Sequence, residues 1–252
     1  MNKILFFDID GTLAYHGKIP PSNIQALQLL KEKGYLTFIC TGRAVYYAKR
    51  LFGDNVSGYI GCNGRYIEYL GEKLLAKPLS ELEKTSFISR CINNDIGYLM
   101  VGENQSYYGN IDDELINSLI QEYGKDHIDK YDHQEVYTLD LFFNDPNRFE
   151  QVENLFKDEL VLNNHHQGSC DCTTLSFDKG SAINYLLNHF QISINNSYAF
   201  GDGINDTYMF REVSNKIAMG NAIDILKQQA TYITDDYDKE GITKALKHFK
   251  LI

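Results

Sequence analysis

Apolar and polar positions along the chain fall into two recurring patterns. Short apolar runs such as Ile4–Phe7 and residues 35–40 are typical of strands that are buried on both faces. Between these two runs, Ile24, Leu27 and Leu30 repeat at the spacing of one helix face. Because strands and helices alternate in this way, the pattern predicts a parallel sheet with right-handed crossovers.

The same alternation continues to residue 62 and returns after residue 178. It predicts a helix that ends near residue 52 and a third strand at 59–62. In the second half it predicts a helix that opens at Lys179, strands at 197–200 and 216–219, a short helix around 209–210, and a last helix at about 242–249. The predicted fold class is therefore α/β, with a parallel-sheet core.

Hairpin signals interrupt the alternation in the middle of the chain. Asn63 and Gly64 precede the run Tyr66–Tyr69 and predict an antiparallel turn. Ser80 and Glu83 have the spacing of a capping box, which opens a helix to about residue 94. Strands then mix with helices, at 98–102, 106–108, 137–143 and 171–176 for strands and 112–123 and 148–159 for helices. We therefore expect a core domain of residues 1–78 and 173–252, with an α+β cap domain inserted at 79–172.

Two aspartates follow the first strand directly. Asp8 and Asp10 are separated by one residue, and alternate residues of an extended chain point the same way, so both carboxylates can face one site. That site lies at the carboxyl end of a strand, where open α/β sheets bind ligands. Two carboxylates there repel each other unless a proton or a cation intervenes, and Mg²⁺ prefers such hard oxygen ligands. Gly11 allows the chain to turn sharply.

A third carboxylate is expected at the same edge of the sheet. Asp202 follows the strand at 197–200, in the run Gly-Asp-Gly-Ile-Asn-Asp. Three carboxyl positions and a phosphate suit octahedral Mg²⁺, so Asp8, Asp10 and Asp202 are the predicted metal ligands, with the Asp10 backbone carbonyl as a further donor. Asp8 is the predicted nucleophile, which attacks phosphorus to form an acyl phosphate. Asp10 is the predicted acid and base, which protonates the leaving oxygen and then deprotonates water.

Further polar residues at strand ends and helix starts complete a phosphoryl-transfer site. Thr41, with Gly42 beside it, is predicted to offer a hydroxyl and helix N–H groups to the phosphoryl oxygens. Lys179 is predicted to neutralise charge on the transferring group, and Asn205 to donate an amide N–H to it. Asp206 is expected behind them, where it orients Lys179 or a water at the metal.

Each of these residues also has a simpler interpretation. Thr41 could be an ordinary helix N-cap, and Lys179 could be a solvated lysine. The run at 201–206 could be a calcium-type turn, although it lacks the closing Glu of an EF-hand loop. Arg43 could contact the substrate or pair with a nearby acid, and the sequence favours neither.

Composition and charge limit the class of protein. A chain of 252 residues with 43% hydrophobic and 23% charged residues predicts a folded, soluble protein. The net charge of −10 argues against a nucleic-acid surface. No run is long enough to span a bilayer and the first residues do not form a signal peptide, so a cytoplasmic protein without a membrane partner is expected.

Cysteine usage predicts no disulfide framework. The chain has five cysteines and no C-x-x-C pair. Cys170 and Cys172 lie near His165 and His166, which raises a zinc site as one interpretation. Alternation along a strand is the favoured interpretation, because C-x-C is not a usual spacing of structural zinc sites.

The motifs resemble the haloacid dehalogenase superfamily, and specifically its Cof-type phosphatases with the larger α+β cap of type C2. The matching segments, in the order of the family, are FFDIDGTL (6–13), CTGR (40–43), CNG (62–64), DKG (178–180), FGDGINDTYM (200–209) and AMGNA (218–222). The resemblance implies a Rossmann-like core with the cap inserted between the threonine and lysine motifs. It implies these roles: Asp8 as nucleophile, Asp10 as acid and base, Thr41, Lys179 and Asn205 on the phosphate, and Asp8, Asp10 and Asp202 on Mg²⁺.

One segment departs from the family pattern. The family often has an Asn-Asp-x-Asp-Gly run before the last helix, where this chain has Tyr-Asp-Lys-Glu-Gly at 237–241. That loop is expected to lie outside the chemistry.

The expected function is a Mg²⁺-dependent phosphatase that hydrolyses small phosphorylated metabolites, a sugar phosphate or similar, through an aspartyl-phosphate intermediate. A phosphotransferase or mutase of the same superfamily is an alternative, since it shares every motif and differs only in the acceptor. A phospho-aspartate signalling module is another alternative, although such a module is much shorter and needs neither an insert nor Asp10. A non-catalytic binding protein is disfavoured because all motif positions are intact. Hexose phosphates are the first substrates to test, on family analogy alone, and the sequence predicts no oligomeric state.

Overall fold

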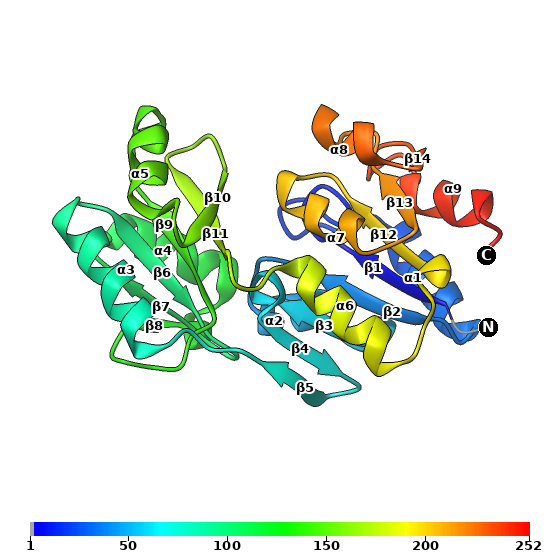
Figure 1. The fold of residues 1–252 in the computed structure, drawn as a ribbon, viewed down its shortest axis with the longest axis horizontal. Helices are drawn as coiled ribbons and strands as arrows, with labels where there is room; N and C mark the ends of the chain where they lie inside the picture. The colour runs from blue at the N-terminus through cyan, green and yellow to red at the C-terminus, as the bar shows by residue number, and fades with distance from the viewer. Residues whose placement is uncertain (1–2) are drawn as a thin grey trace.

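The computed structural model describes residues 3–252, which contain two β-sheets (Figure 1). The strands of the core sheet are β1 (Ile4–Phe7), β2 (Leu36–Cys40), β3 (Gly58–Gly61), β4 (Tyr66–Tyr69), β5 (Glu72–Ala76), β12 (Ser197–Gly201), β13 (Asn215–Ala218) and β14 (Tyr232–Ile233). The core helices are α1 (Pro21–Glu32), α2 (Val45–Phe52), α6 (Lys179–His189), α7 (Thr207–Arg211), α8 (Asp224–Gln229) and α9 (Gly241–His248). The strand order is β14-β13-β12-β1-β2-β3-β4-β5.

The core sheet is parallel from β14 to β3, which confirms the predicted α/β fold class. β1 lies between β12 and β2, and Ile4 is the register partner of both Ser197 and Leu36. The hairpin predicted at Asn63 and Gly64 is present, with a left-handed backbone at both residues. β4 and β5 run antiparallel and extend the core sheet at its edge.

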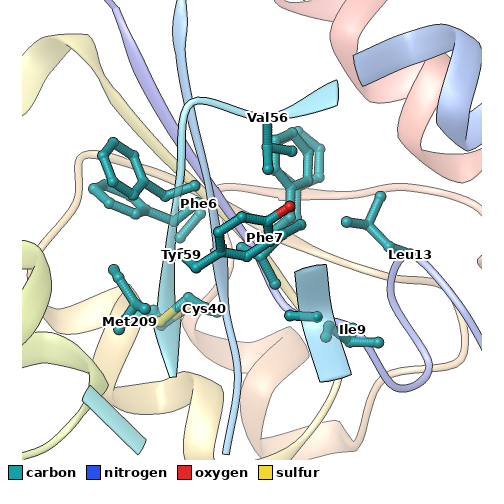
Figure 2. Close-up of a cluster of buried hydrophobic side chains, with 14 of the residues drawn as sticks. Phe6, Phe7, Ile9, Leu13, Cys40, Val56, Tyr59 and Met209 are labelled. Atoms are coloured by element: carbon teal, nitrogen blue, oxygen red, sulfur yellow. The ribbon is translucent and has the colours of Figure 1, made fainter. Parts of the chain in front are cut away.

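Burial on both faces fixes β1 at the centre of the sheet. Phe6 and Phe7 are neighbours on the strand and therefore point to opposite faces, yet both are 0% exposed. The rings of Phe7 and Phe200 stack with their centroids 4.6 Å apart. Figure 2 shows this cluster, which also contains Cys40 and Met209. Burial of each phenylalanine contributes about 1.5–3 kcal/mol, so the apolar run stabilises the strand that carries the aspartates.

The insert is an α+β unit built on the second sheet, on the left of Figure 1. Its strands are β6 (Gly97–Val101), β7 (Ser106–Gly109), β8 (Ile128–Lys130), β9 (Thr138–Phe142), β10 (Leu160–Asn164) and β11 (Ser169–Thr174), and its helices are α3 (Glu81–Asn93), α4 (Asp113–Tyr123) and α5 (Phe149–Phe156). The strand order is β10-β11-β9-β6-β7-β8. Cys170 and Cys172 of β11 pack with Phe87 of α3 and Phe156 of α5 in an apolar cluster of the insert.

Three strands were not predicted from the pattern: β8, β10 and β14. β8 and β14 are only three and two residues long, and β10 ends in two asparagines, so none shows a clear alternation. The capping box of α3 is present, with Glu83 N donating to Ser80 Oγ at 3.2 Å. The predicted domain boundary after residue 172 falls inside β11, and the division into core and cap domains remains a prediction. Within residues 3–252, no helix is long and apolar enough to cross a membrane.

Candidate active site

The strand order brings the predicted clusters to one edge of the core sheet. Asp8, Thr41 and Asp202 each come directly after a strand, and these strands, β1, β2 and β12, are immediate neighbours. Because the three strands are parallel, their carboxyl ends meet at the same edge. Lys179 is the first residue of α6, and its side chain reaches the same point. Residues separated by up to 194 positions in the sequence therefore share one site.

Lys179 is the centre of this cluster. Its side chain is 0% exposed, and Nζ donates to Asp8 Oδ1 at 2.7 Å and to Asp206 Oδ1 at 2.8 Å. Burial disfavours the charged amine, but Asp206 and Asp8 outweigh this and hold the pKa of Lys179 well above its ordinary value. The alternative of a solvated lysine is therefore wrong.

The carboxylates outnumber the positive charge available to them. Asp8, Asp202 and Asp206 each offer an oxygen, and these atoms lie within 4.8 Å of one another. Burial, and next Asp206, raises the pKa of Asp8 well above its usual range and that of Asp202 to about 7. Thr12 Oγ1 donates to Asp202 Oδ1 at 2.9 Å and orients it. A cluster of hard oxygen atoms that is short of positive charge is chemically suited to a divalent cation.

Asp206 is held in place by more contacts than the other two carboxylates. Besides Lys179 on Oδ1, it accepts from the backbone N–H groups of Asp202 at 2.8 Å and Gly203 at 3.0 Å, both on Oδ2. Both oxygens are thus engaged. These contacts agree with the expected orienting position of Asp206 next to Lys179.

The side chain of Asp10, which the sequence predicted to be a metal ligand, contacts an arginine instead. Its carboxylate faces Arg43, which donates from Nε to Oδ2 at 2.7 Å and from Nη2 to Oδ1 at 3.3 Å. Within residues 3–252, the carboxylates that lie close enough together to share a metal ion are those of Asp8, Asp202 and Asp206, and Asp10 is not among them. Arg43 also contacts Glu122 and donates to the Tyr123 hydroxyl at 2.9 Å, so it pairs with acids from both the core and the insert.

The loop after β2 approaches the insert closely. Thr41 is buried and its Oγ1 accepts from Arg43 N at 3.2 Å, whereas the N-cap of α2 is Ala44, so Thr41 is not the N-cap. A Cβ on Gly42 would lie 3.0 Å from Asn63 Oδ1 and 3.2 Å from Asp171 Oδ2. A side chain at position 42 would press on Asn63 and Asp171, so glycine gives this loop room against the insert.

A cleft of about 900 Å³ lies between the core edge and the insert. Asp8, Asp10, Thr41, Gly42, Asp202 and Asn205 line it from the core. Residues that line it from the insert were not predicted from the sequence: Glu122, Tyr123, Asp140, Asn163, His165 and Asp171. One signal was available, because Asp140 interrupts an otherwise apolar strand between Leu139 and Leu141.

The zinc interpretation finds no support in the geometry. Cys170 and Cys172 point into the apolar cluster of the insert, whereas His165 Nε2 lies 3.0 Å from Asp171 Oδ1. Cys170 and Cys172 therefore lie on the face of β11 opposite to Asp171, the residue that His165 contacts, as alternation along a strand predicts.

Comparisons with known proteins agree with the motifs. The sequence pattern of the haloacid dehalogenase-like hydrolases matches residues 5–246. The chain belongs to this family. Of its relatives, YkrA of Bacillus subtilis (strain 168) is 29% identical, with 100% of this chain and 99% of YkrA covered. The 5-amino-6-(5-phospho-D-ribitylamino)uracil phosphatase YwtE of the same strain is 26% identical, with 95% of each chain covered.

A solved structure extends the similarity to the whole fold. The subclass IIB sugar phosphatase BT4131 superposes with a TM-score of 0.86 and 27% identity, and all of both chains is covered. These findings confirm the resemblance stated from the motifs and the Rossmann-like core. They also confirm the predicted enzyme class, a phosphoric monoester hydrolase.

Proposed function

We propose that this hydrolase is a Mg²⁺-dependent phosphatase that acts on small phosphorylated metabolites through an aspartyl-phosphate on Asp8. The observation that carries the proposal is the buried Lys179, which binds Asp8 beside the carboxylates of Asp202 and Asp206, with Asp8 and Asp202 lining the cleft. The cleft has the volume of a small-molecule site. Similarity to a sugar phosphatase favours a sugar phosphate or a similar ester as substrate.

The oxygen atoms of the cluster fit a divalent cation. We assign Mg²⁺ to the side chains of Asp8 and Asp202 and to the backbone carbonyl of Asp10. Asp206 is left out of this set because both of its oxygens already accept hydrogen bonds. Bound there, Mg²⁺ screens the charge of the phosphoryl oxygens and of the nucleophile.

The residues of the chain then carry out two steps. Asp8 forms a bond to phosphorus while the ester oxygen–phosphorus bond breaks, and Asp10 gives its proton to the leaving oxygen. A water next attacks phosphorus and gives a proton to Asp10, and the bond between Asp8 and phosphorus breaks to release phosphate. Lys179, Thr41 and Asn205 bind the phosphoryl oxygens during both steps.

Hydrolysis of p-nitrophenyl phosphate tests the nucleophile and the metal. We expect turnover that EDTA abolishes and Mg²⁺ restores, and that Asp8→Asn lowers by at least about 10³-fold because the amide is a poor nucleophile. Asp54→Asn is the matched control, since Asp54 is an exposed residue of the core far from the cleft lining. Turnover that survives Asp8→Asn contradicts the nucleophile, and turnover indifferent to EDTA contradicts the metal.

The products distinguish hydrolysis from transfer. We expect equal amounts of p-nitrophenol and inorganic phosphate, also when glucose or glycerol is added as an acceptor. An excess of p-nitrophenol over phosphate in the presence of an acceptor would instead identify a phosphotransferase.

A further inference from the structure

A row of polar side chains crosses three strands of the insert where it faces the active site. Asn163 of β10 is the register partner of Asp171 of β11, and Asp171 is the register partner of Asp140 of β9. Register partners on adjacent antiparallel strands lie on the same face of a sheet. All three residues line the cleft. We call Asn163, Asp171 and Asp140 the polar row.

The middle residue of the row, Asp171, lies beside the core loops that carry Gly42 and Asn63. Asp171 Oδ2 accepts from Asn63 Nδ2 at 3.0 Å, and it lies 3.2 Å from the position of a Cβ on Gly42. The row therefore crosses the wall of the insert next to Thr41 and Gly42, the residues predicted to bind the phosphoryl group. A leaving group attached to phosphorus is the part of a substrate that would meet it.

Asp171 is fully engaged and orients its neighbours. His165 Nε2 contacts Oδ1 at 3.0 Å, and the amides of Asn163 and Asn63 both donate to Oδ2, at 2.9 Å and 3.0 Å. The NH₂ group of Asn163 must face this carboxylate, because its carbonyl oxygen would be repelled there. The Asn163 Oδ1 atom is thus fixed as an acceptor that points away from Asp171.

Two acceptors of the row have no partner within the described residues. Asn163 is only 6% exposed, and its buried Oδ1 accepts no hydrogen bond. Asp140 makes no side-chain hydrogen bond with residues 3–252 either, and it faces Asp171, a like charge, across the strand pair. Burial and Asp171 raise the pKa of Asp140 to about 7. Unpaired acceptors and adjacent acids both reduce stability, so a fold that retains them has a use for them.

The basic side chains near the polar row, His165 and Arg43, already contact acidic residues of the protein. His165 and Arg43 are the positive groups that act on Asp140, and Asp171 and Glu122 are the acids that add to its negative surroundings. His165 contacts Asp171, and Arg43 contacts Asp10 and Glu122. An anionic leaving group would find acceptors here, while Arg43 and His165 already contact acids of the protein.

We propose that Asp140, which lines the cleft on β9 next to Asp171, forms a subsite that binds hydrogen-bond donors of the leaving group, its hydroxyl or ammonium groups, and that rejects carboxylate leaving groups. This proposal rests on the proposed phosphatase function and identifies Asp140 as a specificity-determining residue. The donor on the substrate gives its hydrogen bonds to the Asp140 carboxyl group, whereas Asn163 Oδ1 is buried.

Four phosphate esters test the subsite. Sorbitol 6-phosphate carries hydroxyl donors, phosphoethanolamine carries an ammonium donor, phosphoglycolate carries a carboxylate, and p-nitrophenyl phosphate carries no donor. For the wild-type enzyme we expect kcat/KM for phosphoglycolate to be at least tenfold below that for the better donor substrate. A higher value for sorbitol 6-phosphate assigns the subsite to hydroxyl groups, and a higher value for phosphoethanolamine assigns it to ammonium groups.

The decisive variant is Asp140→Leu, which suits a strand that already carries Leu139 and Leu141. We expect the ratio of kcat/KM for the donor substrate to that for p-nitrophenyl phosphate to fall at least tenfold. Asp140→Ala is the second variant if Asp140→Leu does not fold, and Asp129→Asn, on the exposed edge strand β8, is the control that leaves the ratio unchanged.

Outcomes against the subsite differ from outcomes against the phosphatase function. An unchanged ratio in a folded Asp140 variant overturns the subsite, because a merely structural role lowers turnover of all esters alike. Preference of the wild type for phosphoglycolate also overturns it. Absence of any p-nitrophenyl phosphate hydrolysis by the wild type, by contrast, overturns the proposed function itself.

Discussion

Replacement of Lys179 by methionine tests the electrostatic design of the site. Methionine has nearly the length of lysine and no charge, so Lys179→Met removes the ammonium group and keeps the buried volume. The carboxylate oxygens of Asp8, Asp202 and Asp206 lie within 4.8 Å of one another. Two unit charges that far apart repel by about 3.5 kcal/mol at an effective dielectric constant of about 20. The variant loses the ammonium group of Lys179 that offsets this repulsion, and we expect it to be less stable by about 3–5 kcal/mol at pH 8.

The loss of stability should depend on pH with a defined sign. The pKa of Asp8 is already raised by burial and by Asp206 in the folded protein, and removal of Lys179 raises it further. A folded-state pKa above the unfolded value means that the folded protein binds more protons between those two values. The free energy of unfolding of Lys179→Met should therefore fall, relative to wild type, as the pH rises from 5 to 8.

Urea unfolding followed by circular dichroism at pH 5 and pH 8 measures this difference. Turnover of p-nitrophenyl phosphate at saturating Mg²⁺ should fall at least about 10²-fold as well, because Lys179 no longer offsets charge on the phosphoryl group. In the double variant Lys179→Met with Asp206→Asn, stability should recover in part while turnover should not. A Lys179→Met protein as stable as wild type at pH 8 would show that the carboxylates do not depend on this lysine.

Three further predictions follow from other contacts. The Gly11→Ala variant should be less stable by at least about 1 kcal/mol, because Gly11 has a left-handed backbone. It should also lose most Mg²⁺-dependent turnover, because the added Cβ would lie 2.1 Å from Asp202 Oδ2. Retained turnover would contradict this position of Asp202. Glu122→Gln weakens the contact of Arg43 with the insert, and should raise KM two- to fivefold with little change in kcat. A fall in kcat alone would be evidence that this contact does not hold the insert against the core. Asp140→Asn should be more stable than wild type at pH 8, by about 1–3 kcal/mol in urea unfolding, and only as stable as wild type at pH 4, because the folded pKa of Asp140 lies near 7 and its buried charge costs stability as the pH rises to that value; an equal gain at both pH values would contradict a charge effect.

The core and its polar edge could be predicted because they depend on local pattern and one general rule. Burial of Phe6 and Phe7 on opposite faces requires an apolar run, and that run is visible in the sequence. Once the strands are parallel, residues directly after them, such as Asp8, Thr41 and Asp202, meet at one edge. Lys179 joins them because Asp178 caps α6 at this edge.

The arrangement of charges around these residues was not predictable from spacing. Arg43 has two acids within reach, Asp10 in the core and Glu122 in the insert, and only the packing of the insert on the core decides that it contacts both. Within the core, the turn after β12 places Asp206, and not the Asp10 carboxylate, beside Asp8 and Asp202, because the backbone N–H groups of Asp202 and Gly203 hold its carboxylate.

The sequence by itself determined the parallel core, the strand that carries Asp8, and the set of residues at the carboxyl ends, because each depends on neighbours within one strand or helix. Tertiary structure decided the polar row of Asn163, Asp171 and Asp140. These residues come from three strands, one of which the pattern did not predict, and a shift of one residue in register would turn each of them to the other face of the sheet. Such a register is set by long-range pairing and by burial of the whole insert, and no local pattern contains it.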